Sequence, residues 1–193
     1  MTAPAPPATP EGALAQAFAL LARGVADRRS PFHTPTLATR GTDGTPNLRT
    51  VVLRAFDPAA RRLRIHTDRR SAKAAEVLTE PRVMLHGYDA GARVQLRLGA
   101  KATLHLDDAV ADEAWTASRA MSRLTYATEH PPGAEVAAPP ASPAEVGTAR
   151  DNFAVLVLRM DSLDWLLLAH AGHRRARFAW DAAGRLAASW VAP

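Results

Sequence analysis

The sequence predicts a mainly β protein of the α+β class, in which antiparallel strands form a barrel and a few helices lie at its periphery. Short segments with alternating polar and apolar residues recur along the chain, as in Leu63–Thr67. Turn signals such as Gly41–Gly44 separate these segments. The chain has 193 residues, of which 47% are hydrophobic, so it is long enough to bury one core. We therefore expect one domain over residues 11–193, after a Pro- and Ala-rich disordered tail over residues 1–10.

Capping residues and apolar spacing predict three helices. The first begins at Pro10, a residue that suits the first helical position, and Thr9 precedes it as the N-cap. Ser71 is the predicted N-cap of the second helix, which ends before a proline. The predicted ranges are Pro10–Asp27, Ala72–Leu78 and Asp107–Tyr126.

Alternating segments between turns predict the strands. Their ranges are Thr36–Arg40, Asn47–Ala55, Leu63–Thr67, Val83–Tyr88, Arg93–Leu106, Asn152–Met160, Leu163–Leu168, Arg174–Trp180 and Arg185–Val191. Residues 128–150 contain several prolines and little periodicity, which predicts a long loop of functional or disordered character.

Composition excludes several classes of protein and of site. The chain has no cysteine, which excludes disulfides, zinc–thiolate sites and thiol nucleophiles. The apolar runs are only as long as strands, and the N-terminus lacks the pattern of a signal peptide, so we expect a cytoplasmic protein without a membrane segment. The seven histidines do not have metal-ligand spacing, and we expect no metal.

The net charge of +5 comes from 22 arginines and two lysines, Lys73 and Lys101. Such a balance favours an anionic partner, but an Arg-rich composition that reflects codon bias is the alternative. Nucleic acid is a further alternative and predicts affinity that falls steeply with salt. We expect no nucleic acid, because the arginines are dispersed and only 6% of residues are aromatic.

Three cations crowd the start of the predicted second helix, namely Arg69, Arg70 and Lys73 around Ser71. Cations are unfavourable at a helix N-terminus, where backbone N–H groups carry partial positive charge. The arrangement is favourable when an anion binds there, and phosphate is the usual anion. The alternative is a solvated basic turn.

Two strand segments carry polar residues whose faces can be assigned. Arg49 and Arg54 are five apart in a strand and project to opposite faces, so one of them can reach the anion at Ser71 while the other faces a second ligand. Gln95 and Arg97 share one face, where an amide can pair with the polar edge of a ring. The alternative is that these are solvated residues on exposed strands.

In this order, the segments resemble those of the pyridoxamine 5′-phosphate oxidase-like flavoproteins, whose fold is the FMN-binding split barrel. Arg49–Arg54 resembles the Arg-x-Val-x-Leu-Lys/Arg strand of that family. Ser71–Lys73 resembles its Ser-Arg-Lys phosphate motif, with Arg70 in place of the missing arginine. Gln95–Ala102 resembles its Gln-x-x-x-x-Gly-Lys-Ala strand. The resemblance covers about residues 34–193.

The resemblance implies FMN as the cofactor, with its phosphate at Arg49 and its ring beside Val51–Arg54. His66 and Thr67 stand in place of the family's aromatic–threonine pair, and Gln95 is expected at the ring. The implied cofactor-binding residues are Arg49, Thr50, Val51, Val52, Leu53, Arg54, His66, Thr67, Arg70, Ser71, Lys73, Gln95, Trp165 and Arg177. The implied substrate-binding residues are Arg54, Arg119 and His173.

The sequence departs from the substrate signature of the authentic oxidase. His173–Arg175 stands where the family has Arg-x-His, Trp115 where it has tyrosine, and Arg123 where it has serine. The resemblance therefore implies an FMN-dependent oxidoreductase that transfers a hydride between flavin N5 and an unidentified small molecule, without an assigned acid or base. It also implies a homodimer with FMN at the interface. The alternative is a split barrel that binds a flavin or a tetrapyrrole without turnover.

Overall fold

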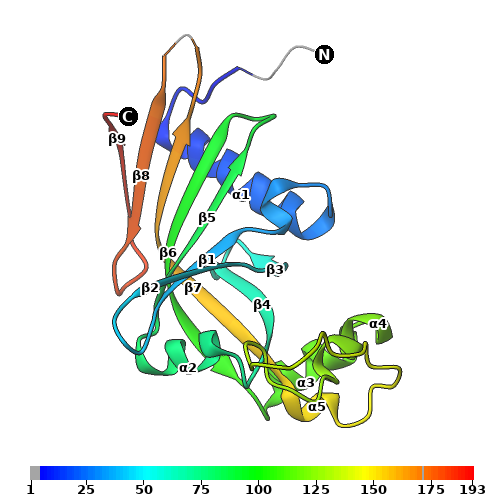
Figure 1. Cartoon of the computed structure of the whole chain (residues 1–193). Helices are drawn as coiled ribbons and strands as arrows, with labels where there is room; N and C mark the ends of the chain where they lie inside the picture. Colours follow the sequence, from blue (N-terminus) through cyan, green and yellow to red (C-terminus); the bar gives the residue numbers. More distant parts are fainter. Residues whose placement is uncertain (1–4, 171) are drawn as a thin grey trace.

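The computed structural model describes residues 5–170 and 172–193, and antiparallel β-structure dominates this part of the chain (Figure 1). The strands form one sheet in the order β2-β1-β5-β6-β7-β4-β3, and β8 and β9 extend it beyond β7. Their bounds are β1 Thr36–Arg40, β2 Pro46–Thr50, β3 Leu53–Asp57, β4 Arg62–Asp68, β5 Arg82–Asp89, β6 Val94–His105, β7 Phe153–Leu167, β8 Arg174–Trp180 and β9 Leu186–Val191. The predicted mainly β class is confirmed.

The sheet curves on itself but does not close, which makes it a split barrel. Strand β7 pairs with β6 along its length, with β4 over Phe153–Arg159 and with β8 over Ser162–Leu167. Strands β2 and β3 lie at the two ends of the strand order and are connected through Val51 and Val52. The opening of the barrel therefore coincides with this connection.

Two strand predictions differ from the structure. The predicted strand Asn47–Ala55 is two strands, because the chain leaves β1 after Thr50 and joins β4 only from Leu53. The predicted strands Asn152–Met160 and Leu163–Leu168 are one strand, β7, whose ladder with β6 continues through an irregularity at Gly99–Ala100. Local turn signals did not predict either outcome, because both depend on which strand lies alongside.

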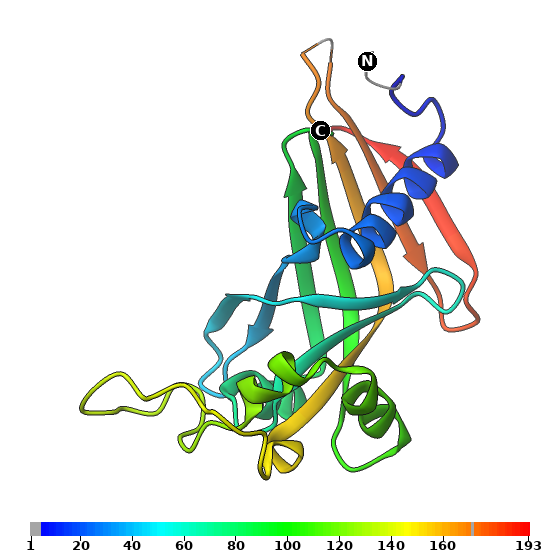
Figure 2. The same cartoon turned by 90° about the vertical axis from the view of Figure 1, so that its right-hand side faces the viewer.

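Helices cover the two ends of the sheet (Figures 1 and 2). Helix α1, Pro10–Ala26, is capped by the Thr9 side chain, which accepts from the Gly12 amide at 3.2 Å. It buries Ala13, Ala17, Leu20 and Leu21 in the main core, whereas α2, Ala72–Thr79, lies toward the opposite end. The short helix η1, Pro31–His33, follows α1. Among the described residues, no helix is both long and apolar enough to span a membrane.

The predicted helix Asp107–Tyr126 is instead three short pieces, α3 Ala109–Ala117, α4 Ala120–Arg123 and η2 Leu124–Tyr126. Ser118 is extended and ends α3. The guanidinium of Arg123 folds back and donates to the carbonyls of Trp115 (3.1 Å) and Thr116 (2.8 Å). These bonds satisfy helix-terminal carbonyls that a continuous helix would have paired internally.

A second, smaller core lies under these pieces. The rings of Trp115, Tyr126 and Phe153 contact one another with centroids 4.9 to 6.3 Å apart. Residues 128–148 then run without a regular element until α5, Ala149–Asn152, as predicted for a long loop. The disordered tail predicted for residues 1–10 falls partly on residues 1–4, which lie outside the described residues.

Candidate cofactor and substrate cleft

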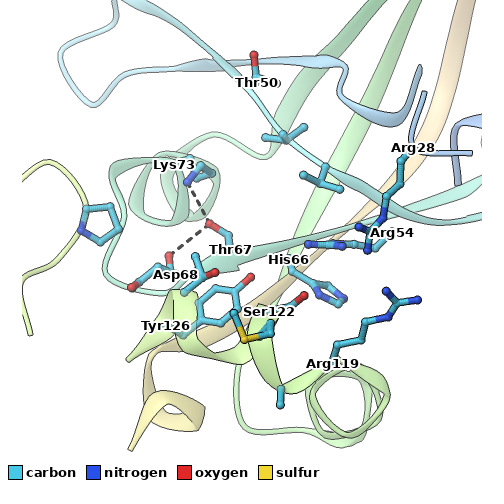
Figure 3. Close-up of a pocket in the computed structure, with 16 residues that line it drawn as sticks. Arg28, Thr50, Arg54, His66, Thr67, Asp68, Lys73, Arg119, Ser122 and Tyr126 are labelled. Atoms are coloured by element: carbon cyan, nitrogen blue, oxygen red, sulfur yellow. Dashed lines mark hydrogen bonds between the residues drawn. The ribbon is translucent and has the colours of Figure 1, made fainter. Parts of the chain in front are cut away.

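A cleft of about 690 Å³ opens where the barrel is split, between the β2–β3 connection and the α4–η2 segment (Figure 3). Thr50, Val51, Val52 and Arg54 line one side. The other predicted site residues that line the cleft are His66, Thr67, Lys73 and Arg119. Segments that are far apart in the sequence thus meet at one cavity, which is of the size usual for a small-molecule site.

The side of the cleft at Val51 and Val52 is not part of a strand ladder. The ladder of β2 with β1 ends at Thr50, and that of β3 with β4 begins at Leu53. The Val51 amide donates instead to the Pro35 carbonyl at 3.0 Å. This stretch of backbone therefore faces the cavity as an edge, and a planar ligand can lie against it.

One end of the cleft carries a partly buried cation and two hydroxyl groups. Lys73, in the first turn of α2, donates to Thr67 Oγ1 at 3.1 Å, and Thr67 Oγ1 lies 3.2 Å from Ser71 Oγ. The Ser71 hydroxyl bonds to the Asp68 carbonyl and does not cap α2. Burial lowers the pKa of Lys73, and the nearby Arg49 charge lowers it further. An anion at this end would relieve both effects.

Arg49 lies beside this cation but does not line the cleft. Its guanidinium donates to Thr39 Oγ1 and, at 2.9 Å, to the carboxylate of Glu76, which is 5% exposed. Burial alone raises the pKa of Glu76, but hydrogen bonds from Thr39 and Asn47 and the charge of Arg49 outweigh it, and the pKa lies below its usual value. Arg49 thus forms an ion pair with a carboxylate of its own chain.

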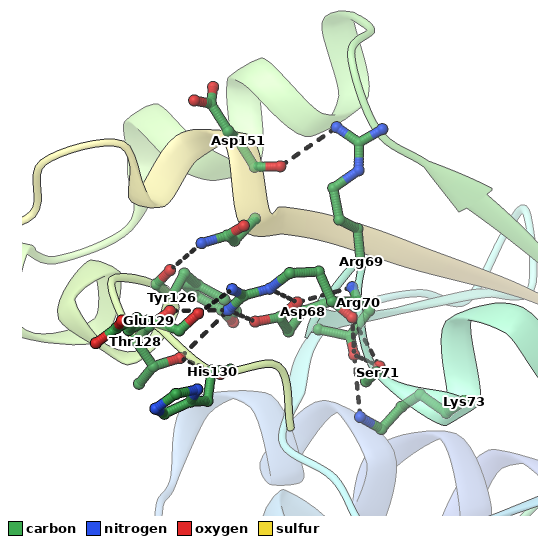
Figure 4. A network of polar contacts seen from close by, with 12 residues as sticks. Asp68, Arg69, Arg70, Ser71, Lys73, Tyr126, Thr128, Glu129, His130 and Asp151 are labelled. Carbon is green, nitrogen blue, oxygen red and sulfur yellow. Dashed lines mark hydrogen bonds and ion pairs between the residues drawn. The ribbon is translucent and has the colours of Figure 1, made fainter. Parts of the chain in front are cut away.

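Arg70 connects the start of α2 to the long loop (Figure 4). Its guanidinium donates to the Asp68 carboxylate at 2.8 and 3.1 Å, and to the carbonyls of Thr128 and Glu129 at 3.1 and 3.2 Å. The hydrogen bonds and charge of Asp68 raise the pKa of Arg70. The neighbouring Arg69 points away and bonds Asp107 at 3.3 Å.

Replacing Arg70 with methionine is expected to release the loop over residues 128–148 and to lower the free energy of unfolding by roughly 2 kcal/mol, because a buried carboxylate loses its ion pair. Asp68 is 6% exposed, so water cannot replace the guanidinium fully. Limited proteolysis and amide exchange of the loop measure the release, and urea unfolding measures the stability. Arg69→Met is the matched control, and equal effects from both variants would contradict this role.

His66 lies at the centre of the cleft wall, in contact with the Phe153 ring at a centroid distance of 5.0 Å. Burial, together with the charges of Arg54 and Arg64, lowers the pKa of His66 to about 4. Tyr126 lies nearby, and burial raises the pKa of its phenol to about 12. The imidazole is therefore neutral and the phenol protonated at neutral pH.

Acidification is expected to destabilise the fold through His66. The imidazole has an ordinary pKa of 6.5 and a folded-state pKa of about 4, so between these values the unfolded chain binds a proton that the folded protein does not. The contribution of neutral His66 is fully present above pH 6.5 and is lost as the pH falls toward 4, at up to about 1 kcal/mol per pH unit. Urea unfolding between pH 7 and 4.5 measures this slope. The slope of His66→Gln should be shallower, and an unchanged slope would contradict the assignment.

The remaining predicted residues lie elsewhere on the single chain. Gln95 and Arg177 project from the outer face of the sheet, where Gln95 contacts His86 at 3.3 Å and Arg177 contacts Asp164 at 3.3 Å. Trp165 is fully buried on the opposite face and donates to Gln16 Oε1 at 3.0 Å. His173 lines a separate pocket beside Trp190.

The strand register shows how many strands separate Arg177 from Thr50, which lines the cleft. Residues aligned across the sheet run from Thr50 through Thr36, His86, Arg97 and Asp164 to Arg177. These are five steps from strand to strand, or roughly 24 Å along the sheet at about 4.8 Å a step. Arg177 does not line the cleft of its own chain, and it lines a different cavity together with Arg97 and Asp164.

Residues 15–106 match the family model described as pyridoxamine 5′-phosphate oxidase, FMN-binding domain. Over this range the chain is similar to the FMN-binding domain of pyridoxamine 5′-phosphate oxidase. The resemblance seen in the sequence is thereby confirmed. The matched range contains the β2–β3 connection and the start of α2, so it includes most of the residues that line the cleft.

Solved structures of other proteins share the fold. An FMN-binding protein related to pyridoxamine 5′-phosphate oxidase from Nostoc punctiforme PCC 73102 is 25% identical, with a TM-score of 0.75 over 97% of this chain and 98% of that one. PhzG from Burkholderia lata 383, solved with tetrahydrophenazine-1-carboxylic acid, is 20% identical with a TM-score of 0.75 over 97% and 94%. A protein from Clostridium acetobutylicum related to general stress protein 26 is 11% identical, with a TM-score of 0.56 over 86% and 94%. No curated protein matches the chain.

Several residues that line the cleft were not predicted from the sequence. Arg28 follows α1, and Ser122 and Tyr126 lie in the segment that was expected to be a continuous helix. Asp68, the carboxylate partner of Arg70, was not among the predicted site residues either. Arg28 belongs to a run of basic residues after an apolar helix, which is common on protein surfaces and did not single it out.

Proposed function

We propose that the protein is an FMN-dependent oxidoreductase acting on a small molecule. The observation that carries the proposal is the desolvated ammonium of Lys73, grouped with two hydroxyls at the start of α2, beside a strand edge in an FMN-binding domain. FMN has one phosphate at the end of a chain and a planar ring at the other. The cleft has a cationic end, which suits the phosphate, and a backbone edge at Val51 and Val52, which suits the ring.

The phosphate of FMN is assigned to the Lys73 end. Lys73, Thr67 and Ser71 supply donors there, and the backbone N–H groups at the start of α2 add partial positive charge. Arg49 contributes its charge from the neighbouring strand, while its hydrogen bonds go to Thr39 and Glu76. Arg70 acts indirectly, because its bonds to Asp68 and to Thr128 hold the start of α2 against the loop.

The flavin ring is assigned to the stretch Thr50–Val52, with Arg54 and His66 further along the cleft. Bound FMN supplies hydride transfer at N5, and oxygen or a reduced nicotinamide completes the cycle. The chain supplies the position of the ring, a neutral imidazole at His66 and the cations of Arg54 and Arg119 toward the substrate. No acid or base is assigned among these residues.

A second copy of the chain is proposed to complete the site. Gln95 and Arg177 do not line the cleft of their own chain, and both project from the outer face of the sheet. That face also exposes Leu48, Met84 and Tyr88, which would be buried between two copies. Multi-angle light scattering is expected to give the mass of a homodimer for the FMN-loaded protein, and a monomer would contradict this arrangement.

The absorbance spectrum of the purified protein between the near ultraviolet and the blue tests the cofactor. Bound flavin that is bleached by NAD(P)H or by an amine, and reoxidised in air, supports an oxidoreductase. Bound flavin that stays oxidised with every donor supports the alternative, a split barrel that binds the cofactor without turnover. A tetrapyrrole spectrum, or no chromophore after addition of FMN, would overturn the proposal.

A further inference from the structure

A buried carboxylate, that of Glu76, lies close to the cationic end of the cleft without lining it. Glu76 is three residues after Lys73 on α2, so the two side chains are neighbours on the surface of that helix. The Glu76 side chain is 5% exposed, and a carboxylate is seldom buried to this extent unless the fold gives it specific partners. The partners of Glu76 therefore indicate why a carboxylate occupies this position.

Hydrogen bonds reach Glu76 from β1 and β2, the two strands that precede the β2–β3 connection. Thr39 on β1 donates to its Oε2. On β2, Asn47 donates to Oε1 at 2.7 Å and Arg49 to Oε2 at 2.9 Å. Both oxygens of the carboxylate are thus occupied, and they connect α2 to the strand that carries Arg49.

These contacts hold the guanidinium of Arg49 without using all of its donors. One terminal nitrogen donates to Thr39 and the other to Glu76. A guanidinium has further N–H groups, and among the described residues those of Arg49 have no acceptor. The Arg49 side chain is 22% exposed, so these donors can reach an anion that enters from solvent beside Lys73.

Glu76 also compensates the repulsion between two neighbouring cations. The charged groups that act on Lys73 come from three elements, namely Arg49 on β2, Asp68 at the end of β4 and Glu76 on its own helix. Burial and the charge of Arg49 lower the pKa of Lys73, whereas the two carboxylates raise it. Because Asp68 is paired with Arg70, Glu76 is the carboxylate that Lys73 and Arg49 share. Figure 3 shows Lys73 reaching from α2 to Thr67 at this end of the cleft.

We propose that Glu76 is a positioning residue for the phosphate of FMN: it orients Arg49 toward the anion that Lys73 binds, and its charge lets both cations stay charged in a partly buried site. The inference rests on the proposed function, and it adds a residue that is not among those implied by the resemblance. Simple repulsion between a carboxylate and a phosphate predicts the opposite sign for the effect of Glu76. The direction in which FMN binding changes when the charge is removed is therefore decisive.

Titration of Glu76→Gln with FMN, followed by flavin fluorescence, tests this role. The amide keeps the shape of the side chain and can bond to the same partners once the Asn47 amide has turned over. The dissociation constant is expected to rise about tenfold, as for the loss of one charge-assisted hydrogen bond. Glu80→Gln is the matched control, because it removes the same charge at the other end of α2, where Glu80 pairs with Arg82 at 2.6 Å. It should leave the constant unchanged.

The lysine content of the chain provides a second readout that needs no flavin. Lys73 and Lys101 are the only lysines, so protein labelled with ¹³C at lysine Cε gives two signals, and Lys101→Met assigns them. In flavin-free Glu76→Gln, the titration of Lys73 should move to lower pH than in the wild-type protein, because a charge that raises its pKa is gone. A carboxylate that only stabilised the packing of α2 would leave this titration unchanged.

A second variant, Thr39→Val, keeps the inference testable if Glu76→Gln does not fold. Valine preserves the β-branched shape on β1 and leaves both charges in place, but it removes the hydroxyl between Arg49 and Glu76. The dissociation constant for FMN should rise roughly two- to tenfold, as for one neutral hydrogen bond, while the Lys73 titration stays at the wild-type pH. Circular dichroism verifies that each variant is folded, and unchanged FMN binding in Thr39→Val would argue against the orientation of Arg49 by Glu76.

Three results would overturn the role of Glu76: FMN that binds Glu76→Gln as tightly as the wild-type protein or more tightly, equal weakening in Glu80→Gln, or a Lys73 titration that does not move. Failure of the proposed function gives a different result, namely a wild-type protein that binds no FMN. Inorganic phosphate is then added while the Lys73 signal is observed. A smaller response in Glu76→Gln than in the wild type supports the positioning role for another phosphate ligand, and no response in the wild type overturns it.

Discussion

Lys73→Met is expected to raise the dissociation constant for FMN by roughly 10- to 100-fold, since one charge-assisted hydrogen bond to phosphate contributes about 1.5–3 kcal/mol. Methionine keeps much of the volume of the lysine stem, so the start of α2 should stay packed. The ammonium is partly buried next to Thr67 and Ser71, where salt in solution screens it less than a surface charge. Quenching of flavin fluorescence during titration measures the constant.

The chain provides its own control for this variant. Lys101, the only other lysine, lies exposed on β6, and Lys101→Met should leave the dissociation constant unchanged. Arg49→Ala should also weaken FMN binding, and it should lower the melting temperature more than Lys73→Met because it leaves Glu76 buried without its ion pair. Normal flavin content in both Lys73→Met and Arg49→Ala would contradict the assignment of the phosphate site.

Trp165→Ala is expected to lower the free energy of unfolding by about 3–5 kcal/mol, which is a large part of the 5–15 kcal/mol typical of a domain. Trp165 is 0% exposed within its own chain, and its indole N–H bonds to Gln16 on α1. Removing the ring leaves a cavity between the sheet and that helix. Chemical unfolding monitored by circular dichroism measures the loss.

Trp190→Ala is the comparison for this variant. The Trp190 ring lies 6.2 Å from that of Trp165, but it is 41% exposed on β9, so its removal should cost much less. A folded Trp165→Ala protein of normal stability that has lost FMN would contradict the core role and favour the cofactor contact that the resemblance implies.

Helix α1 and several strands could be predicted because the capping residues and the alternating patterns that define them lie within the segment itself. Helix α1 begins at Pro10 with Thr9 as its cap, and strands β1 and β8 have their predicted bounds. The segment Asn47–Ala55 was wrong as one strand, because a β-branched run does not reveal which neighbour it pairs with. Helix propensity over 107–126 did not reveal that Arg123 would cap α3 with its side chain.

Site residues, too, could be predicted only where the signal lies within one short segment of the sequence. Sequence patterns marked Lys73, Thr67 and Arg54, and the structure brings all three to one cleft. The carboxylates that neutralise Arg49 and Arg177, Glu76 and Asp164, were not predicted. Each of them is aligned with its arginine only by the packing of α2 or by the register of β7 with β8.

The shared strand β7 has a consequence for the order in which the molecule can assemble. Strands β4 and β6 are both complete by His105, yet each needs Phe153–Leu167 as its partner. A nascent chain that has not yet reached Phe153 therefore exposes two unpaired strand edges while about fifty further residues are synthesised. Contacts that span so much sequence also slow folding. The long stretch before β7 thus leaves one edge of β4 and one edge of β6 unpaired until β7 has been synthesised.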